Sequence, residues 1–187
     1  YDGELADKDE PVRFLTLAPE IDNEDAIDSF RRTAAEWANA NTHPNIVSVY
    51  DRDDDPRPWI AVEDVAGQPL DAVQSSLSPV ETKAVVADVA EALRNAVLYN
   101  AYHLNLRPNH VWVVPDEEGV TGLVDEWGLE RSVRTAIGET DVTPFTAPEV
   151  VSNPNAGDEQ TDVYGLGALV YFTLTGQPPV TAGADMD

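Results

Sequence analysis

The sequence contains no cysteine, and this absence excludes several classes of protein. Without thiols the chain has no disulfide scaffold, no thiolate zinc site, no iron–sulfur cluster and no cysteine nucleophile. Long hydrophobic runs are missing too, because the longest, at 166–172, is far shorter than the roughly 20 apolar residues of a membrane-spanning helix. The chain opens at Tyr1 without a basic and apolar leader, so we expect a fragment of a cytoplasmic protein with no membrane segment.

Positive charge is scarce as well. The chain has 35 acidic and 11 basic residues, which gives a formal net charge of −24, and only Lys8 and Lys83 are lysines. A field of this sign repels phosphate backbones, so we expect no nucleic-acid partner. An acidic, lysine-poor surface resembles the surfaces of halophilic proteins, in which dissolved cations screen the repulsion. A merely acidic domain from an ordinary environment is the alternative interpretation.

The chain does contain enough apolar material for one full-sized domain. Hydrophobic residues make up 42% of the 187 residues, and a chain of this length can bury roughly 70% of its unfolded surface. The pattern in the first third predicts a strand at 11–17, a helix at 23–40 that Asn23 caps, and strands at 46–50 and 59–62.

The pattern changes after the hinge-like stretch 65–69 and becomes mainly helical. Ser78 and Glu81 form a capping box, which predicts the start of a helix that ends near Asn100. The other elements predicted here are the two strands of a hairpin and a last helix, at 111–114, 120–124 and 159–175. This order of elements indicates the α+β class, with two lobes in one domain.

Six short segments carry motifs. They are His-Pro-Asn-Ile-Val at 43–47, Trp-Ile-Ala-Val-Glu-Asp-Val-Ala-Gly at 59–67, His-Leu-Asn-Leu-Arg-Pro-Asn-His at 103–110, Glu-Trp-Gly at 126–128, Ala-Pro-Glu at 147–149 and Asp-Val-Tyr-Gly-Leu-Gly at 162–167. Their order resembles that of the eukaryotic-type (Hanks-type) serine/threonine protein kinase family, with its H-R-D-L-K-P-x-N, D-F-G and A-P-E motifs. The resemblance covers nearly the whole chain and implies a degenerate, pseudokinase-like member, which the acidic surface suggests is haloarchaeal.

The resemblance implies a protein-kinase-like two-lobed fold, with the N-lobe at 1–66 and the C-lobe at 67–187. It also implies truncation at both ends. No glycine lies between Gly3 and Gly67, so the family's glycine-rich loop, whose backbone cradles phosphates, is missing. The chain stops at Asp187, soon after the segment that resembles the family's F helix, so the helices that follow it are missing as well.

The resemblance also implies that the N-lobe lacks the charged groups of an active kinase. Leu15 stands in the place of the lysine that holds the α- and β-phosphates, and Arg13 lies two residues earlier on the same strand face. The family prefers a small residue at that point, under the adenine, so Arg13 either contacts phosphate or fills the cleft. The glutamate of the family's C helix falls at Thr33 or Ala34.

The segment that resembles the catalytic loop also lacks residues that an active kinase needs. Asn105 stands where the family has its general base, and an amide cannot accept a proton near neutral pH. His110 replaces the second metal-binding asparagine, although magnesium prefers oxygen ligands. Glu126 replaces the metal-binding aspartate and keeps the carboxylate with one extra methylene. Asp125 lies one residue too early and, by strand alternation, should face the other way.

Other family positions keep their residues. The resemblance implies that His103 packs under the catalytic loop, that Asp162 braces the backbone of that loop, and that Glu149 ends the activation segment. We expect the polar stretch 129–146 to be the segment between two anchoring motifs.

We therefore expect a pseudokinase that serves as a regulatory or interaction module, needs no cofactor, and binds a protein partner or itself through surface that the missing helices leave exposed. The alternative is an atypical serine/threonine kinase that binds ATP and magnesium, with Glu126 on the metal and Arg13 or Arg107 on phosphate. If a nucleotide binds, the backbone of Glu63 and Val65 would meet the adenine, as in the family's hinge. A third interpretation is an unrelated acidic binding domain.

Overall fold

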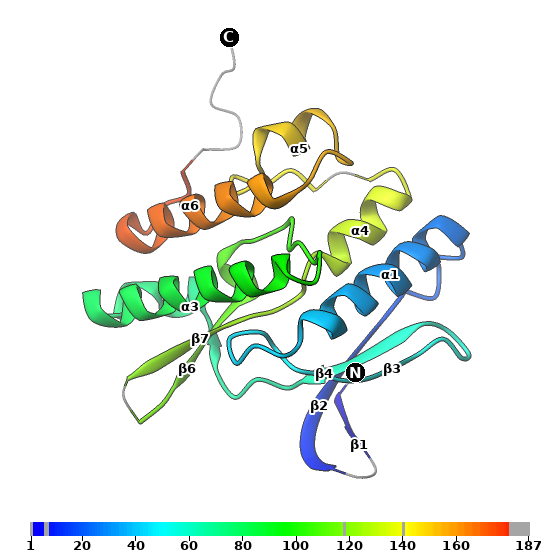
Figure 1. Ribbon diagram of the computed structural model, residues 1–187, viewed down its shortest axis with the longest axis horizontal. Helices are drawn as coiled ribbons and strands as arrows, with labels where there is room; N and C mark the ends of the chain where they lie inside the picture. The colour runs from blue at the N-terminus through cyan, green and yellow to red at the C-terminus, as the bar shows by residue number, and fades with distance from the viewer. Residues whose placement is uncertain (1, 6–7, 118, 140, 180–187) are drawn as a thin grey trace.

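A four-stranded antiparallel sheet and one long helix form the N-terminal lobe of the computed structural model, which describes residues 2–5, 8–117, 119–139 and 141–179 (Figure 1). The sheet has the order β1-β2-β4-β3. Its strands are β1 (Asp2–Leu5), β2 (Lys8–Thr16), β3 (Val49–Asp53) and β4 (Trp59–Glu63), and the helix is α1 (Glu24–Ala40). The Asn23 side chain accepts a hydrogen bond from the Ala26 amide at 3.0 Å, which confirms the predicted cap of α1.

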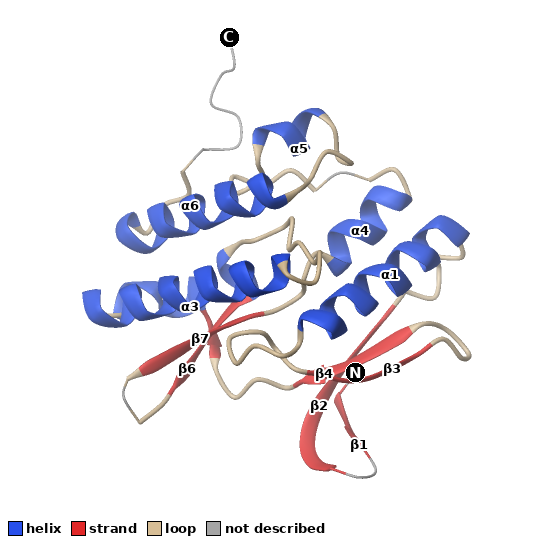
Figure 2. Cartoon of the chain, in the orientation of Figure 1, coloured by secondary structure: helices blue, strands red, loops and turns tan. Residues whose placement is uncertain are grey.

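The C-terminal lobe is mainly helical, with one small sheet of order β5-β6-β7 (Figure 2). Its strands are β5 (Gln68–Pro69), β6 (Val111–Pro115) and β7 (Val120–Val124). Its α-helices are α2 (Leu70–Val73), α3 (Pro79–Val97), α4 (Leu129–Ala136), α5 (Pro148–Ser152) and α6 (Glu159–Thr175), with 3-10 turns at Gln74–Ser76 and Pro108–His110. No helix in these described ranges is both long and apolar enough to cross a bilayer.

The predicted hairpin and two long helices of this lobe are confirmed. Ser78 and Glu81 form both bonds of the capping box at the start of α3, at 3.3 and 2.8 Å. Helix α6 ends at Gly176, whose φ of 69° is the left-handed conformation in which glycine commonly terminates a helix.

A short segment before β3 joins the two lobes. The Val47 amide donates to the Val124 carbonyl at 2.9 Å, and the Val124 amide donates to the Asn45 carbonyl at 2.8 Å. The indole nitrogen of the fully buried Trp37 donates to the Val47 carbonyl at 3.0 Å. The predicted strand at 46–50 was therefore wrong at its start, because residues 45–47 bond to β7 and pairing with β4 begins only at Val49.

Helix α4 lies inside the stretch 129–146, for which the sequence predicted only a polar segment between two anchoring motifs. Leu129 and Val133 are four residues apart, so they share one helical face, and both are buried. The helix packs against α1 (Figure 1). A stripe of this kind in a short, highly charged segment is a weak pattern, because most of its stabilisation comes from the neighbouring helix.

Candidate functional site

An ion pair joins the two lobes at the cleft between them. The Nη2 atom of Arg13, on β2, lies 2.5 Å from Oδ2 of Asp125, which follows β7. The Trp112 indole nitrogen, on β6, donates to the same oxygen at 2.9 Å, and the Arg13 guanidinium lies 5.9 Å from the centre of the Trp112 ring. The Asp125 side chain is only 3% exposed and that of Arg13 is 25% exposed, so this pair is largely removed from solvent.

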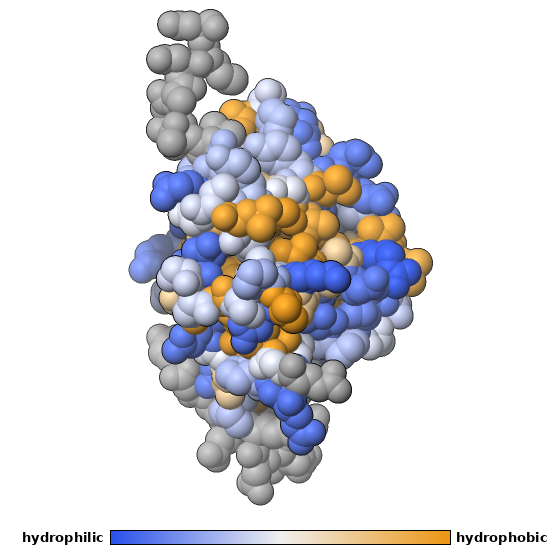
Figure 3. All heavy atoms as spheres, turned by 90° about the vertical axis from the view of Figure 1, so that its left-hand side faces the viewer, coloured by the Kyte–Doolittle hydropathy of each residue, from blue (hydrophilic) through white to orange (hydrophobic). Residues whose placement is uncertain are grey.

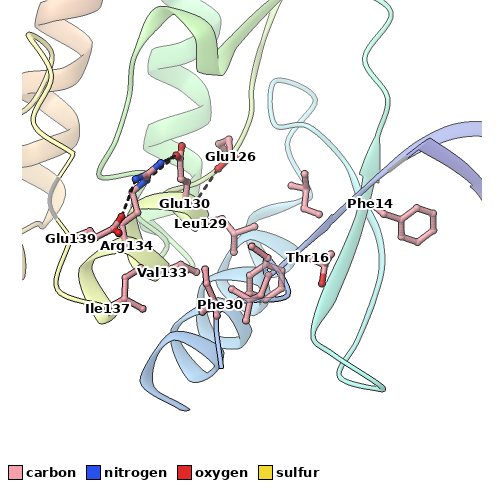
Figure 4. A pocket seen from close by; sticks show the side chains of 14 residues that line it. Phe14, Thr16, Phe30, Glu126, Leu129, Glu130, Val133, Arg134, Ile137 and Glu139 are labelled. Carbon is pink, nitrogen blue, oxygen red and sulfur yellow. Dashed lines mark hydrogen bonds and ion pairs between the residues drawn. The ribbon is translucent and has the colours of Figure 1, made fainter. Parts of the chain in front are cut away.

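Strand alternation explains why Arg13 reaches the cleft. Residue 14 faces the other side of β2, where the Phe14 ring packs edge-on against Trp59 with the centres 5.4 Å apart. Figure 4 shows Phe14 pointing away from the other side chains drawn there. Arg13 and Leu15 therefore share the inner face, and Leu15 lines a cavity next to the cleft.

The side chains of Asp125 and Glu126 point to different parts of the structure, although the two residues are neighbours in sequence. Residues 126, 127 and 128 have φ values of 72°, 37° and 68°, so the chain turns sharply directly after Asp125. The Asp125 carboxylate faces Arg13, whereas the Glu126 carboxylate lines the same cavity as Leu15 and accepts only a long bond, 3.4 Å, from the Glu130 amide. Burial raises the pKa of Glu126 to about 7, and repulsion from Asp125 adds to that shift.

The two histidines of the catalytic-loop segment are buried and hydrogen-bonded at both ring nitrogens. His103 Nε2 donates to the Asp125 carbonyl at 2.9 Å, and its Nδ1 accepts from the Asn105 amide at 3.3 Å. His110 Nδ1 donates to the Asn105 carbonyl at 3.0 Å, and its Nε2 accepts from Arg107 at 3.2 Å. Burial lowers the pKa of His103 to about 3 and that of His110 to about 4, so both rings are neutral near pH 7.

The shifted pKa of His110 predicts an acid-sensitive contribution to stability. Its folded-state pKa of about 4 lies below the ordinary value of 6.5, so between these values the unfolded chain binds more protons. Stability from this group is present above pH 6.5 and is lost as the pH falls toward 4. Urea unfolding should therefore show the wild type losing about 1.4 kcal/mol per pH unit relative to His110→Asn between pH 6 and 4.5. Parallel pH profiles for the two proteins would contradict this expectation.

Arg107 is held by the segment that follows Gly128. It donates to Glu130 of α4 and to Asp141, both at 3.1 Å, in addition to His110. Its side chain is only 15% exposed. All of its donor nitrogens are thus engaged in contacts within the protein.

Asp162 braces the catalytic loop from α6. Its two carboxylate oxygens accept bonds from the backbone amides of His103 and Leu104 at 2.7 and 2.6 Å. Burial raises the pKa of Asp162 to about 6, although these two bonds act in the opposite direction. Glu149 accepts a bond from the Thr161 hydroxyl at 2.8 Å, so it anchors α5 to the start of α6.

The remaining predicted positions lie on α1 and at the link between the lobes. Thr33 and Ala34, one of which the resemblance places at the position of the family's glutamate, are both buried. The Glu63 amide donates to the Ser48 carbonyl at 2.8 Å, and the Val65 carbonyl accepts from the Gly67 amide at 2.8 Å. Part of the backbone that would meet an adenine is thus already bonded within the protein.

The donors present do not fit a magnesium ion well. In the part of the chain that the structure describes, no three His, Asp or Glu side chains are placed to hold one metal together. Both ring nitrogens of His110 are engaged, and Asp125 is paired with Arg13. The carboxylate of Glu126 is left as a single hard ligand, whereas magnesium demands near-octahedral oxygen coordination.

The sequence matches the family model of the protein kinase domain over residues 16–187. This chain belongs to the protein kinase domain family. The kinase domain is 31% identical over 165 residues to serine/threonine-protein kinase PknB of Mycobacterium leprae, and 30% identical over 165 residues to PknJ of Mycobacterium tuberculosis. These matches cover 80% of the chain but only 26% and 27% of the two relatives, so it spans about a quarter of their length.

Solved structures agree on the fold of this kinase domain. The crystal structure of the PknI kinase domain of Mycobacterium tuberculosis superimposes with a TM-score of 0.72 at 24% sequence identity. The match covers 96% of this chain and 70% of that one. The predicted protein-kinase-like fold is therefore confirmed, as is the relation to serine/threonine kinases.

Sequence reasoning missed that Arg13 has a partner in the other lobe. The sequence indicates Asp125 only as a misplaced metal ligand, and Trp112 only as one of four tryptophans that pack in the core or the cleft. A usable signal was present: Arg13 is an arginine on the inner face of a strand, and an inward-facing cation needs a counter-charge.

Proposed function

We propose that this kinase domain is a pseudokinase: it does not transfer phosphoryl groups and serves as a regulatory or interaction module. The ion pair between Arg13 and Asp125 carries the proposal. The family keeps a small residue where Arg13 stands, and the guanidinium instead crosses the cleft to a buried carboxylate, against the Trp112 ring. A nucleotide would have to displace this pair and leave Asp125 buried without its counter-charge.

The contacts of the other family positions support the same conclusion. Phosphoryl transfer depends on a few charged groups that position and stabilise the reacting phosphate. Leu15 has no charge, and Asn105 has no proton-accepting carboxylate. Arg107, which could have contacted phosphate, is committed to Glu130 and Asp141.

Nucleotide binding and transfer test the proposal directly. We expect thermal unfolding of the 187-residue chain at high salt to show no magnesium-dependent shift on addition of ATP, and radiolabelled ATP to give no labelled protein. An active serine/threonine kinase in the same buffer is the positive control. The atypical-kinase alternative predicts the opposite: stabilisation by several degrees that disappears without magnesium, and transfer that Glu126→Gln or Asn105→Ala abolishes.

We also propose that the module has a protein partner or associates with itself through α6. Val163, Tyr171 and Leu174 on this helix are 57%, 47% and 74% exposed. Figure 3 views the molecule from the ends of α3 and α6 and shows apolar side chains gathered among polar ones on this face. Sedimentation velocity over a wide range of protein concentrations tests the proposal of self-association, and pull-down with the Leu174→Ser variant as control tests a partner.

The excess of acidic side chains supports a further part of this proposal, that the protein is adapted to high salt, as in a haloarchaeon. A formal net charge of −24 destabilises a compact chain by self-repulsion unless dissolved cations screen it. Thermal stability that rises steeply with potassium chloride is the expected result, and a protein equally stable in dilute buffer would contradict it.

A further inference from the structure

The cavity that Leu15 and Glu126 line lies beside the interlobe ion pair, between β2, α1 and α4 (Figure 4). Its volume is about 550 Å³, within the usual range for sites of small organic ligands. Arg13, Trp112 and Asp125 do not line it. The recess is therefore separate from the ion pair, although its wall includes Leu15 and Glu126, which the resemblance places at the family's phosphate-binding lysine and metal-binding aspartate.

Most of the cavity wall is apolar. The aliphatic and aromatic side chains come from all three elements and from the loop after β2, and they include Leu15, Leu17, Ile21, Phe30, Leu129 and Val133. Figure 4 shows Phe30, Leu129, Val133 and Ile137 on one side and the charged side chains of α4 together at another. Such a wall favours an apolar ligand body, because each Å² of apolar surface removed from water stabilises binding.

The charged side chains at the cavity leave one carboxylate without a counter-charge. Arg134 pairs with Glu130 at 2.8 Å and with Glu139 at 3.1 Å, and Glu130 also pairs with Arg107. Glu126 forms no ion pair with any described residue, and its one hydrogen bond, from the Glu130 amide, is 3.4 Å long. Glu126 thus lines an apolar cavity with a carboxylate whose hydrogen-bonding capacity is largely unused.

We propose that this cavity binds a small organic cation, with an alkyl or aryl body against the apolar wall and one amine against the Glu126 carboxylate. A carboxylate or phosphate ligand would meet three glutamates and a single arginine that is already paired. A neutral ligand of the same shape would leave Glu126 without a cation. The inference rests on the proposed function, because a magnesium ion on Glu126 would compete with the amine. The titrations below contain no nucleotide or magnesium, so their failure can be told apart from failure of the proposed function.

Binding of this kind would connect three elements. Leu15 lies on β2 and Leu17 directly after it, whereas Phe30 lies on α1 and Val133 on α4. A ligand that contacts all of them stabilises the arrangement in which α4 packs against α1, because it binds the folded state and not the unfolded one.

Three probes with the same body separate the cation from the shape: 4-phenylbutylamine, 4-phenylbutanol and 4-phenylbutyrate. Isothermal titration into the 187-residue chain at high salt and pH 8, where the Glu126 carboxyl is mainly ionised, should show the amine binding at least tenfold more tightly than the alcohol, and no binding of the carboxylate. Equal affinities of amine and alcohol would overturn the role of Glu126. Absence of binding by both would overturn the site.

Variants of the chain then locate the effect. Glu126→Gln should weaken the amine about tenfold and leave the alcohol unchanged, whereas Ile137→Trp, which fills the cavity, should abolish both. Glu117→Gln removes the same charge from the exposed β6–β7 turn and should change neither affinity. An equal loss in Glu117→Gln would overturn the proposal in favour of general attraction to an acidic surface. Should Glu126→Gln fail to fold, Ile137→Trp and the comparison of probes still decide.

Discussion

Replacing Arg13 with alanine is expected to lower the free energy of unfolding by about 2–4 kcal/mol. The substitution leaves the Asp125 carboxylate, 3% exposed, without its cation, and loss of one partner of a buried ion pair costs about 3–5 kcal/mol. We expect a somewhat smaller loss because Arg13 is 25% exposed and Asp125 keeps its bonds from Trp112 and the Glu126 amide. Urea unfolding at high salt measures the change.

Two further variants separate the ion pair from the general effect of removing an arginine. The double variant Arg13→Leu, Asp125→Asn removes both charges and keeps an oxygen acceptor for the Trp112 indole or the Glu126 amide, so it should lose no more stability than Arg13→Ala alone. Arg94→Ala removes an exposed arginine whose one ion pair among the described residues is with Glu91 on the same helix, and it should cost no more than about 0.5 kcal/mol. If Arg13→Ala were as mild as Arg94→Ala, the interlobe pair would not stabilise the folded protein.

The elements that the sequence predicted well are those whose signals are local. The cap at Asn23, the capping box at Ser78 and the terminal Gly176 each lie within one turn of the helix end that they define. The apolar stripe of a long helix repeats several times, so one irregular residue does not hide it. The α+β class and the order of the lobes follow from these elements.

The elements that the sequence did not predict depend on distant partners. Helix α4 has only two turns, and it is stabilised by packing on α1, which lies about a hundred residues away in sequence. Residues 46 and 47 are apolar enough for a strand, but the Val47 amide and the Asn45 carbonyl bond to Val124 of β7 in the other lobe. Neither partnership leaves a periodic pattern in the segment itself.

The same division holds at the site. Motif order was enough to predict that Leu15, Asn105 and His110 stand at catalytic positions of the family, because that prediction needs only residue type and order. The pairing of Arg13 with Asp125 spans 112 positions in the chain and depends on the turn made by residues 126–128. No spacing rule connects two such residues, so only the folded arrangement identifies them as partners.

The largest loss of stability is expected from Asp162→Ala, about 3–5 kcal/mol. The carboxylate is the acceptor for two buried backbone amides, and each amide left without an acceptor costs about 1–3 kcal/mol. Leu104 also has a φ of 59°, a strained conformation for leucine that these bonds help to hold. The measurement is urea unfolding, with hydrogen exchange at the Leu104 amide as the local readout.

Asp162→Asn is the informative comparison, because it keeps one oxygen acceptor and removes the charge. It should keep one of the two bonds and lose about half as much stability as the alanine variant.

The raised pKa of Asp162, about 6 against an ordinary 3.8, adds a pH test. The folded state holds the extra proton between these values, so the wild type loses stability as the pH rises through 6. Asparagine lacks this loss, so the gap between Asp162→Asn and the wild type should narrow from pH 5 to pH 7. Glu159→Ala, on the exposed first turn of α6, controls for removal of an acid from the same helix, and a loss there equal to that of Asp162→Ala would refute the bracing role.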